Sequence, residues 1–143
     1  MFSSSPKYTQ KLGYEFGKTL KGGELVLFSG ILGAGKTVFI RGIAKALQIK
    51  SKITSPTFNV FRVYKCVFPS TGKVGKIYHF DCYRLKKMND LEELGWNEIM
   101  QEENSVILLE WPECILDIKY LKKPIKVSIL INREDNGRVV EIN

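Results

Sequence analysis

The chain has 143 residues, a net charge of +7 and a calculated pI near 9.3, and 44% of its residues are hydrophobic while 26% are charged. A chain of this size can bury a core of its own, and this composition excludes the fibrous and disordered classes. Its longest uncharged stretch, Leu25 to Gly35, is far shorter than the ~18 apolar residues that a membrane span needs. We therefore expect one domain over residues 1–143 that does not cross a membrane.

The N-terminal residues lack the basic patch and apolar run of a secretory signal, which favours a cytoplasmic protein. The cysteines have no paired spacing, so we expect free thiols rather than disulfides or a zinc site at Cys66, Cys82 and Cys114. The positive charge favours a polyanionic partner, either RNA or an acidic protein surface.

The first part of the chain predicts a helix, a strand, a glycine-rich turn and a second helix. Ser5-Pro6 is typical of a helix start, because a hydroxyl caps the helix and proline suits its first position. This helix ends at Gly22-Gly23 and has an apolar face made by Tyr8, Leu12, Phe16 and Leu20. Leu25 to Phe28 is a continuous apolar run, as in a strand covered on both faces, and Lys36 to Leu47 has helical apolar spacing.

The rest of the chain is mostly β in character. Phe58 to Val67 and Lys76 to Tyr83 predict a hairpin, and Ile125 to Ile131 with Arg138 to Ile142 predict a closing pair of strands. Between them, Asn89-Asp90 can cap a helix, and a short apolar strand follows. That helix carries Leu91, Leu94 and Ile99, and the strand is Val106 to Leu109. This order predicts a three-layer α/β fold with a mainly parallel sheet and added antiparallel strands.

The turn between the first strand and the second helix carries the most specific motif. Residues Gly30 to Thr37 fit G-x-x-x-x-G-K-[ST], the phosphate-binding loop. The glycines let the backbone wrap around a phosphate, Lys36 reaches the β- and γ-phosphates, and Thr37 offers its hydroxyl to magnesium. The motif predicts an ATP and Mg²⁺ site of the P-loop NTPase type, with nucleotide-binding residues Gly30, Gly33, Ala34, Gly35, Lys36, Thr37 and Val38.

Magnesium in such a site also needs a carboxylate at the end of a strand beside the loop. Glu110 ends a purely aliphatic run, as in a central parallel strand, whereas the run before Asp81 alternates. We expect Glu110 to bind the metal together with Thr37, and Asp81 to hold a water or act as a general base. The alternative for either acid is a residue that only caps a neighbouring turn.

Two further residues and one absent motif refine this picture. No asparagine is followed by lysine, so the guanine-specific N-K-x-D run is missing and ATP is favoured over GTP. The sole histidine, His79, lies in a hydrophobic run, which favours a hydrogen-bonded structural imidazole over a catalytic one. Trp111 directly follows Glu110, which would draw it toward the site.

Together these motifs resemble the bacterial TsaE (YjeE) family, ATPases of tRNA threonylcarbamoyladenosine synthesis. The resemblance spans Thr9 to about Arg138 and rests on blocks in a fixed order. The blocks are Gly33-Ala34-Gly35-Lys36-Thr37, Ser55-Pro56-Thr57-Phe58, Tyr78-His79-Phe80-Asp81 with Tyr83-Arg84-Leu85, Leu91-Glu92-Glu93-Leu94-Gly95, and Glu110-Trp111-Pro112.

The resemblance implies an ATPase that works with the TsaD and TsaB proteins on adenosine 37 of tRNA, with the tRNA contacted directly or through these partners. It assigns phosphate and magnesium to Lys36 and Thr37, metal to Glu110 and hydrolysis to Asp81, and it counts Lys36 and Glu110 as catalytic together with Asp81. It also places Trp111, Arg138, Ser5 and Thr9 near the nucleotide. Thr57 would lie near it too, in a switch-like loop. Ile31 stands where the family usually has an acidic residue, so nucleotide turnover or docking is expected to differ here.

Two other functions are compatible with a P-loop. A small kinase would pass the γ-phosphate to a metabolite, but the five scattered arginines do not suggest the arginine-bearing lid of such enzymes. A non-catalytic adaptor would use the nucleotide only to set its shape and its basic surface to hold RNA. No arginine finger is evident, so we expect an ATPase that is slow until its partners complete the site.

Overall fold

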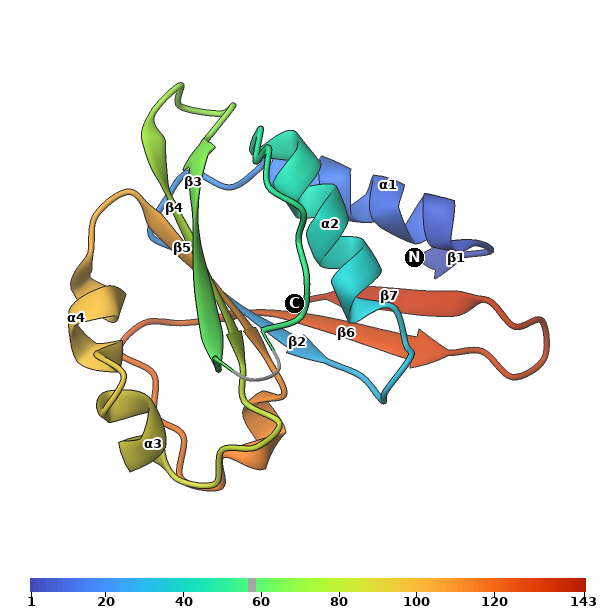
Figure 1. The fold of residues 1–143 in the computed structure, drawn as a ribbon. Coiled ribbons are helices and arrows are strands. Elements are labelled where there is room, and N and C mark those ends of the chain that lie inside the picture. Colours follow the sequence, from blue (N-terminus) through green and yellow to red (C-terminus); the bar gives the residue numbers. More distant parts are fainter. Residues whose placement is uncertain (57–58) are drawn as a thin grey trace.

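A central β-sheet organises the residues that the structure, a computed structural model, describes, namely 1–56 and 59–143 (Figure 1). In spatial order its seven strands are β1 (Phe2–Ser3), β7 (Arg138–Ile142), β6 (Ile125–Ile131), β2 (Leu25–Ser29), β5 (Ser105–Glu110), β4 (Val74–Asp81) and β3 (Phe61–Val67). The four central strands, from β6 to β4, are mutually parallel, whereas β7, β1 and β3 are antiparallel to their neighbours. The predicted mainly parallel sheet with added antiparallel strands is confirmed.

Helices cover both faces of this sheet. The pair α1 (Pro6–Gly17) and α2 (Lys36–Ala46) lies on one face, and α3 (Met88–Glu92) and α4 (Trp96–Gln101) lie on the other (Figure 1). Alternate residues of the central strands therefore enter two separate cores: Phe28 packs with the first pair of helices, and Leu27 packs with the second. Each fully buried apolar side chain contributes roughly 1.5–3 kcal/mol to folding, which explains the continuous apolar runs of the central strands.

Helix α1 begins as predicted but is shorter, and small residues add to its packing. The Ser5 hydroxyl accepts a hydrogen bond from the Tyr8 amide at 3.2 Å, as an N-cap should. The helix ends at Gly17 rather than at Gly22, and its buried residues are small: Thr9, Gly13 and Gly17. Of the predicted apolar face, Leu12, Phe16 and Leu20 pack against the core, whereas Tyr8 is 43% exposed. The closest approach of α1 to α2 is made by small residues.

The segment after β4 also differs from the single helix that Asn89-Asp90 would cap. The structure has two short helices here, and Gly95, with a φ of +87°, separates α3 from α4. Asp90 lies inside the first turn of α3, where its carboxylate accepts hydrogen bonds from the amides of Lys86 and Lys87 at 3.0 and 3.1 Å. The short strand β1 was not predicted, because a two-residue strand carries no periodic signal.

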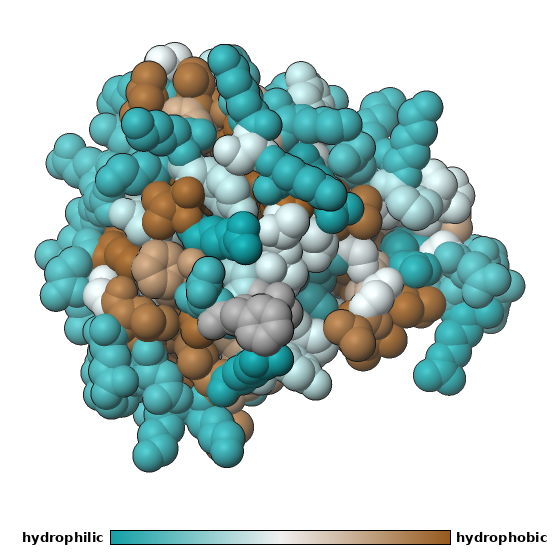
Figure 2. Space-filling model, viewed as in Figure 1, coloured by the Kyte–Doolittle hydropathy of each residue, from teal (hydrophilic) through white to brown (hydrophobic). Residues whose placement is uncertain are grey.

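Several smaller expectations can be compared with the structure. The two hairpins β3–β4 and β6–β7 form as predicted, and the start of the predicted first strand, Phe58, lies outside the described residues. Cys66, Cys82 and Cys114 are free thiols, as expected. Within the described ranges, no helix has the length and apolar character needed to cross a bilayer. Hydrophilic side chains line much of the periphery of the face in Figure 2, with apolar groups between them.

Candidate functional site

A cavity of about 550 Å³ opens at the carboxyl ends of the parallel strands, next to the start of α2. In a parallel α/β sheet this edge is the usual place for a ligand, because strand ends and helix N-termini converge there. The cavity is lined by residues 32–38, Ser55, Val60, Asp81, Tyr83, Arg84, Glu110 and Trp111. The structure thus brings most of the predicted site residues to one place.

The glycine-rich loop and the start of α2 form one wall of the cavity. Gly33 and Gly35 have φ values of +77° and +111°, which side chains with a Cβ rarely adopt. Gly35 is also the N-cap of α2, and no side chain among the described residues caps the helix. The first amides of α2 and the positive end of its dipole therefore face a cavity that suits an anion such as a phosphate.

Lys36 is held against this loop. Its side chain is mostly buried, and its Nζ donates to the carbonyl oxygens of Gly30 at 2.5 Å and Ile31 at 3.2 Å. The ammonium also lies 4.0 Å from the centre of the Trp111 ring, a cation–π contact. Burial lowers the pKa of Lys36, while the carboxylates of Glu110, Glu113 and Asp81 act in the opposite direction. A phosphate in the loop would meet this partly desolvated charge directly.

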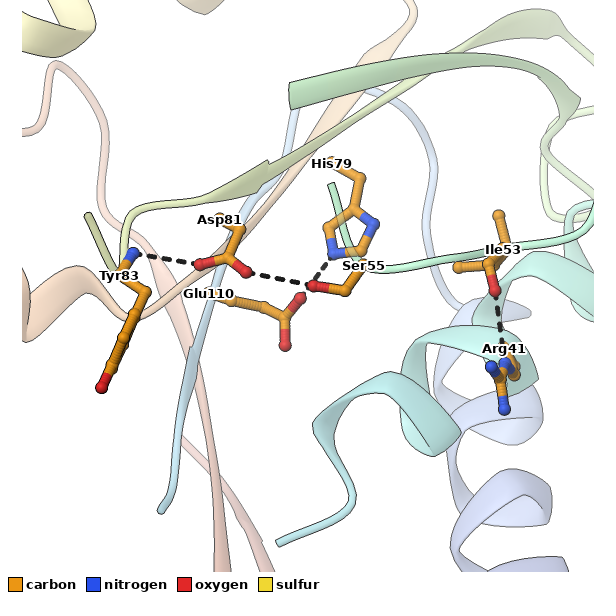
Figure 3. A network of polar contacts seen from close by, with 7 residues as sticks. All are labelled: Arg41, Ile53, Ser55, His79, Asp81, Tyr83 and Glu110. Carbon is orange, nitrogen blue, oxygen red and sulfur yellow. Dashed lines mark hydrogen bonds and ion pairs between the residues drawn. The ribbon is translucent and has the colours of Figure 1, made fainter. Parts of the chain in front are cut away.

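Two carboxylates lie at the ends of adjacent strands (Figure 3). Asp81 accepts hydrogen bonds from the Ser55 hydroxyl at 3.1 Å and from the Tyr83 amide at 3.0 Å. Glu110 lies on β5, directly beside β2 and paired in register with Phe28, as the aliphatic run predicted. The alternating pattern read before Asp81 was wrong, because β4 is buried on both faces at residues 77–80.

The imidazole of His79 lies behind Glu110. Its Nε2 is 2.7 Å from Oε2 of Glu110, and both side chains are buried. This contact confirms the predicted hydrogen-bonded structural histidine. The partner of that hydrogen bond depends on the register between β4 and β5, which the sequence pattern does not give.

Other predicted contacts of the nucleotide lie outside the lining of the cavity. Arg138 holds the loop from behind, since its Nε donates to the carbonyl of Ala34 at 2.9 Å. Thr9 packs under the loop, with its hydroxyl 2.7 Å from that of Ser3. Ser5 caps α1. Gly30 likewise does not line the cavity, and Thr57 lies outside the described residues.

Sequence reasoning assigned no role to several residues of the lining. The ring of Tyr83 packs edge-on against Trp111, with centroids 5.1 Å apart, and so forms part of the wall beside Lys36. Ser55 and Tyr83 belong to the sequence blocks that carry the family resemblance, so their place in the site could have been predicted from it. Val60 belongs to no motif.

The donors in the cavity fit a magnesium ion. The hydroxyl of Thr37 and the carboxylate of Glu110 are hard oxygen donors that line the same cavity. Across the part of the chain that the structure describes, no three His, Cys, Asp or Glu side chains group closely enough to hold a metal ion. Magnesium in nucleotide sites needs only one or two protein ligands, because phosphates and water complete its shell.

Comparison with known proteins gives a consistent family. Residues 3–140 match the model of the family described as "threonylcarbamoyl adenosine biosynthesis protein TsaE". A protein named "tRNA threonylcarbamoyladenosine biosynthesis protein TsaE" from Rickettsia prowazekii is 38% identical over 136 residues, covering 94% of this chain and 87% of that protein. A relative with the same name from Borreliella burgdorferi is 37% identical over 121 residues, covering 85% and 82%.

A solved structure agrees with this grouping. The crystal structure of YdiB from Bacillus subtilis superposes with a TM-score of 0.76 at 25% sequence identity, covering 99% of this chain and 82% of that one. Fold, site and sequence similarity lead to one conclusion: the chain belongs to the TsaE family.

Proposed function

We propose that this protein is a magnesium-dependent ATPase subunit of the cytoplasmic machinery that makes threonylcarbamoyladenosine in tRNA. One observation carries the catalytic part: Lys36, the uncapped start of α2 and two strand-end carboxylates line a single cavity. The names of the relatives, which are tRNA threonylcarbamoyladenosine biosynthesis proteins, support the pathway.

Each residue of the cavity would have a defined task. The amides of the loop and Lys36 would bind the phosphates, and Thr37 and Glu110 would hold Mg²⁺, which offsets phosphate charge when bound. Asp81 already accepts two hydrogen bonds, from Ser55 and Tyr83, and these fix the orientation of its carboxylate. A carboxylate can accept four hydrogen bonds, so Asp81 retains capacity to orient an attacking water and take its proton.

Partners are expected to complete the site. An arginine of the chain itself could also stabilise the transferred phosphate. Arg84 lines the cavity, whereas Arg41 donates to the carbonyl of Ile53 at 3.3 Å and does not line it. An arginine supplied in trans accelerates phosphoryl transfer by roughly 10³ to 10⁵. We propose that TsaD and TsaB provide this stimulation. Leu32 lines the cavity and is 85% exposed, and its neighbour Ile31 is 63% exposed, so a protein that docks beside the cavity would meet both.

The decisive measurement is phosphate release from Mg-ATP by the purified protein, alone and with purified TsaB and TsaD. We expect slow turnover that the partners stimulate, and its loss in Lys36→Ala. Lys45→Ala is the matched control, because Lys45 is an exposed lysine near the other end of α2. A phosphorylated acceptor in place of free phosphate would indicate a kinase, and bound ATP without turnover would indicate a nucleotide-dependent adaptor.

Two further variants test the roles of the carboxylates. Asp81→Ala and Glu110→Ala should retain ATP binding but lose most hydrolysis, because the phosphate-binding loop is unchanged while the metal and water are no longer held. Nucleotide titration beside the phosphate assay separates the two effects. Full turnover in these variants would show that the assigned roles are wrong.

A further inference from the structure

The pair formed by His79 and Glu110 is buried at the back of the cavity. The two side chains are only 1% and 4% exposed, and Nε2 of the imidazole lies 2.7 Å from Oε2 of the carboxylate (Figure 3). His79 is the only histidine of the chain. The imidazole does not line the cavity, so it touches Glu110 without facing the ligand.

The direction of this hydrogen bond follows from the chemistry of its two partners. An ionised carboxylate only accepts hydrogen bonds, so the nitrogen facing Glu110 must carry the proton. The other ring nitrogen, Nδ1, is buried without a partner in the described residues, and His79 lies among apolar side chains that include Ile40 and Leu108. A proton on Nδ1 would be a buried donor without an acceptor, which costs about 1–3 kcal/mol. The hydrogen-bond geometry therefore favours a proton on Nε2, which is donated to Glu110.

We propose that His79 is a positioning residue that sets the orientation of the metal-binding carboxylate. The Nε2 proton holds Oε2 of Glu110 and leaves Oε1 for Mg²⁺. This inference rests on the proposed function. Within the described ranges, His79 provides the only hydrogen bond to the side chain of Glu110.

Loss of this contact would leave the carboxylate free to turn. The Lys36 ammonium interacts electrostatically with Glu110, so an unrestrained carboxylate would be drawn toward it. Glu110 would then be removed from the metal and would compete with phosphate for Lys36. Groups that orient a metal ligand typically change metal affinity by roughly 10- to 100-fold when they are mutated.

Three substitutions at one position separate hydrogen bonding from packing. In His79→Gln the amide nitrogen can take the place of Nε2, whereas in His79→Asn it falls one bond short, and His79→Leu has no donor. The readout is Mg²⁺ titration, by calorimetry, of protein saturated with a non-hydrolysable ATP analogue. We expect His79→Gln to stay within about threefold of wild type and the other two to bind Mg²⁺ at least tenfold more weakly.

Controls make the result specific. Affinity for the metal-free analogue should fall less than affinity for Mg²⁺, and thermal unfolding reports any loss of fold. Equal Mg²⁺ affinity in wild type and His79→Leu would overturn the positioning role and leave the proposed function intact. A wild-type protein that binds no Mg²⁺ with the analogue would overturn both.

The free protein offers a second test that needs neither metal nor nucleotide. Because there is one histidine, a long-range ¹H–¹⁵N spectrum of histidine-labelled protein shows a single imidazole. We expect a ring that carries a proton on Nε2. A ring protonated at Nδ1 alone would contradict the proposal, because its Nε2 could not donate to Glu110.

Discussion

Arg138 shows how a single distant residue can shape the phosphate-binding loop. Its guanidinium, 104 positions along the chain from Ala34, donates to the Ala34 carbonyl at 2.9 Å and reaches that of Gly33 at 3.5 Å. These carbonyls belong to the loop whose amides face the cavity. The C-terminal hairpin therefore holds the loop from behind.

Removal of this guanidinium should weaken nucleotide binding without abolishing it. A hydrogen bond to a charged group is worth about 1.5–3 kcal/mol, so Arg138→Ala should lower ATP affinity by roughly tenfold or more. Arg138→Lys should restore only part of it, because an ammonium lacks the planar fork. Calorimetric titration with the ATP analogue measures the change. Arg133→Ala, at an exposed arginine of the same hairpin, should bind as wild type does.

Some residues of the site could be predicted from a short stretch of sequence, whereas other contacts could not. The loop could be predicted because its motif is contiguous, and Glu110 because a strand of purely aliphatic residues must be central. The contacts of Arg138, and the pairing of His79 with Glu110, depend on strand register and on which strands become neighbours. No periodicity along one segment contains that information.

At the scale of elements, α1 and α2 come so close together that their backbones meet at two glycines. A Cβ at Gly13 would lie 2.0 Å from the carbonyl oxygen of Phe39, and one at Gly42 would lie 2.1 Å from that of Gln10. The two helices therefore touch at reciprocal glycines. The apolar spacing in the sequence predicted both helices and the packing of Leu12, Phe16 and Leu20 against the core. It did not predict the glycine contact, because glycine does not enter a count of apolar residues.

Gly13→Ala should destabilise the protein. The added methyl meets backbone that cannot rotate away, so α1 must shift, and overpacking of this kind costs about 1–3 kcal/mol or more. That exceeds the gain of about 0.5–1 kcal/mol that alanine brings to a helix. Urea unfolding measures the difference, with Lys11→Ala on the exposed face of α1 as the control. Unchanged stability in Gly13→Ala would show that the helices are not in backbone contact.

A second link joins β4 to the turn after α4 and predicts a dependence on pH. The Tyr78 hydroxyl donates to Glu102, which lowers the pKa of Glu102 below its usual 4.5; burial is the main reason that the pKa of Tyr78 rises to about 12. Since the pKa of Glu102 is depressed in the folded state, its stabilisation is present above pH 4.5 and is lost as pH falls through the folded value.

Tyr78→Phe should therefore lower stability near neutral pH and have a shrinking effect in acid. We expect a loss of about 1 kcal/mol in the free energy of unfolding at pH 7, from one hydrogen bond. Urea unfolding at a series of pH values tests this. Tyr14→Phe, at a partly exposed tyrosine of α1, should show no such trend. A difference that stays constant down to strongly acidic pH would exclude Glu102 as the cause.

At the scale of the whole molecule, the sheet separates two cores, and strands β2, β5 and β4 contribute residues to both. Residues of β2 and β5 alternate between the two clusters, so neither core can form without the strands that complete the other. The sequence predicted the layers, because strands buried on both faces require cover on both sides.

The two cores should unfold together as one domain over residues 1–143. The chain has two tryptophans, and Trp96 is fully buried in the core beneath α4, so Trp111→Phe leaves a reporter of that core alone. Its fluorescence and the far-UV circular dichroism should give coincident urea transitions. Separate midpoints would mean that the two faces fold as distinct units.

The β3–β4 turn projects from the sheet edge opposite the cavity, because both strands end their pairing there at Val67 and Val74 while the site lies at the other ends of the strands (Figure 1). Its residues from Pro69 to Lys73 are exposed. The turn is therefore a suitable attachment point for a solid support or a dye. A protein immobilised through Lys73 would have its cavity facing the solution, accessible to nucleotide and partner proteins.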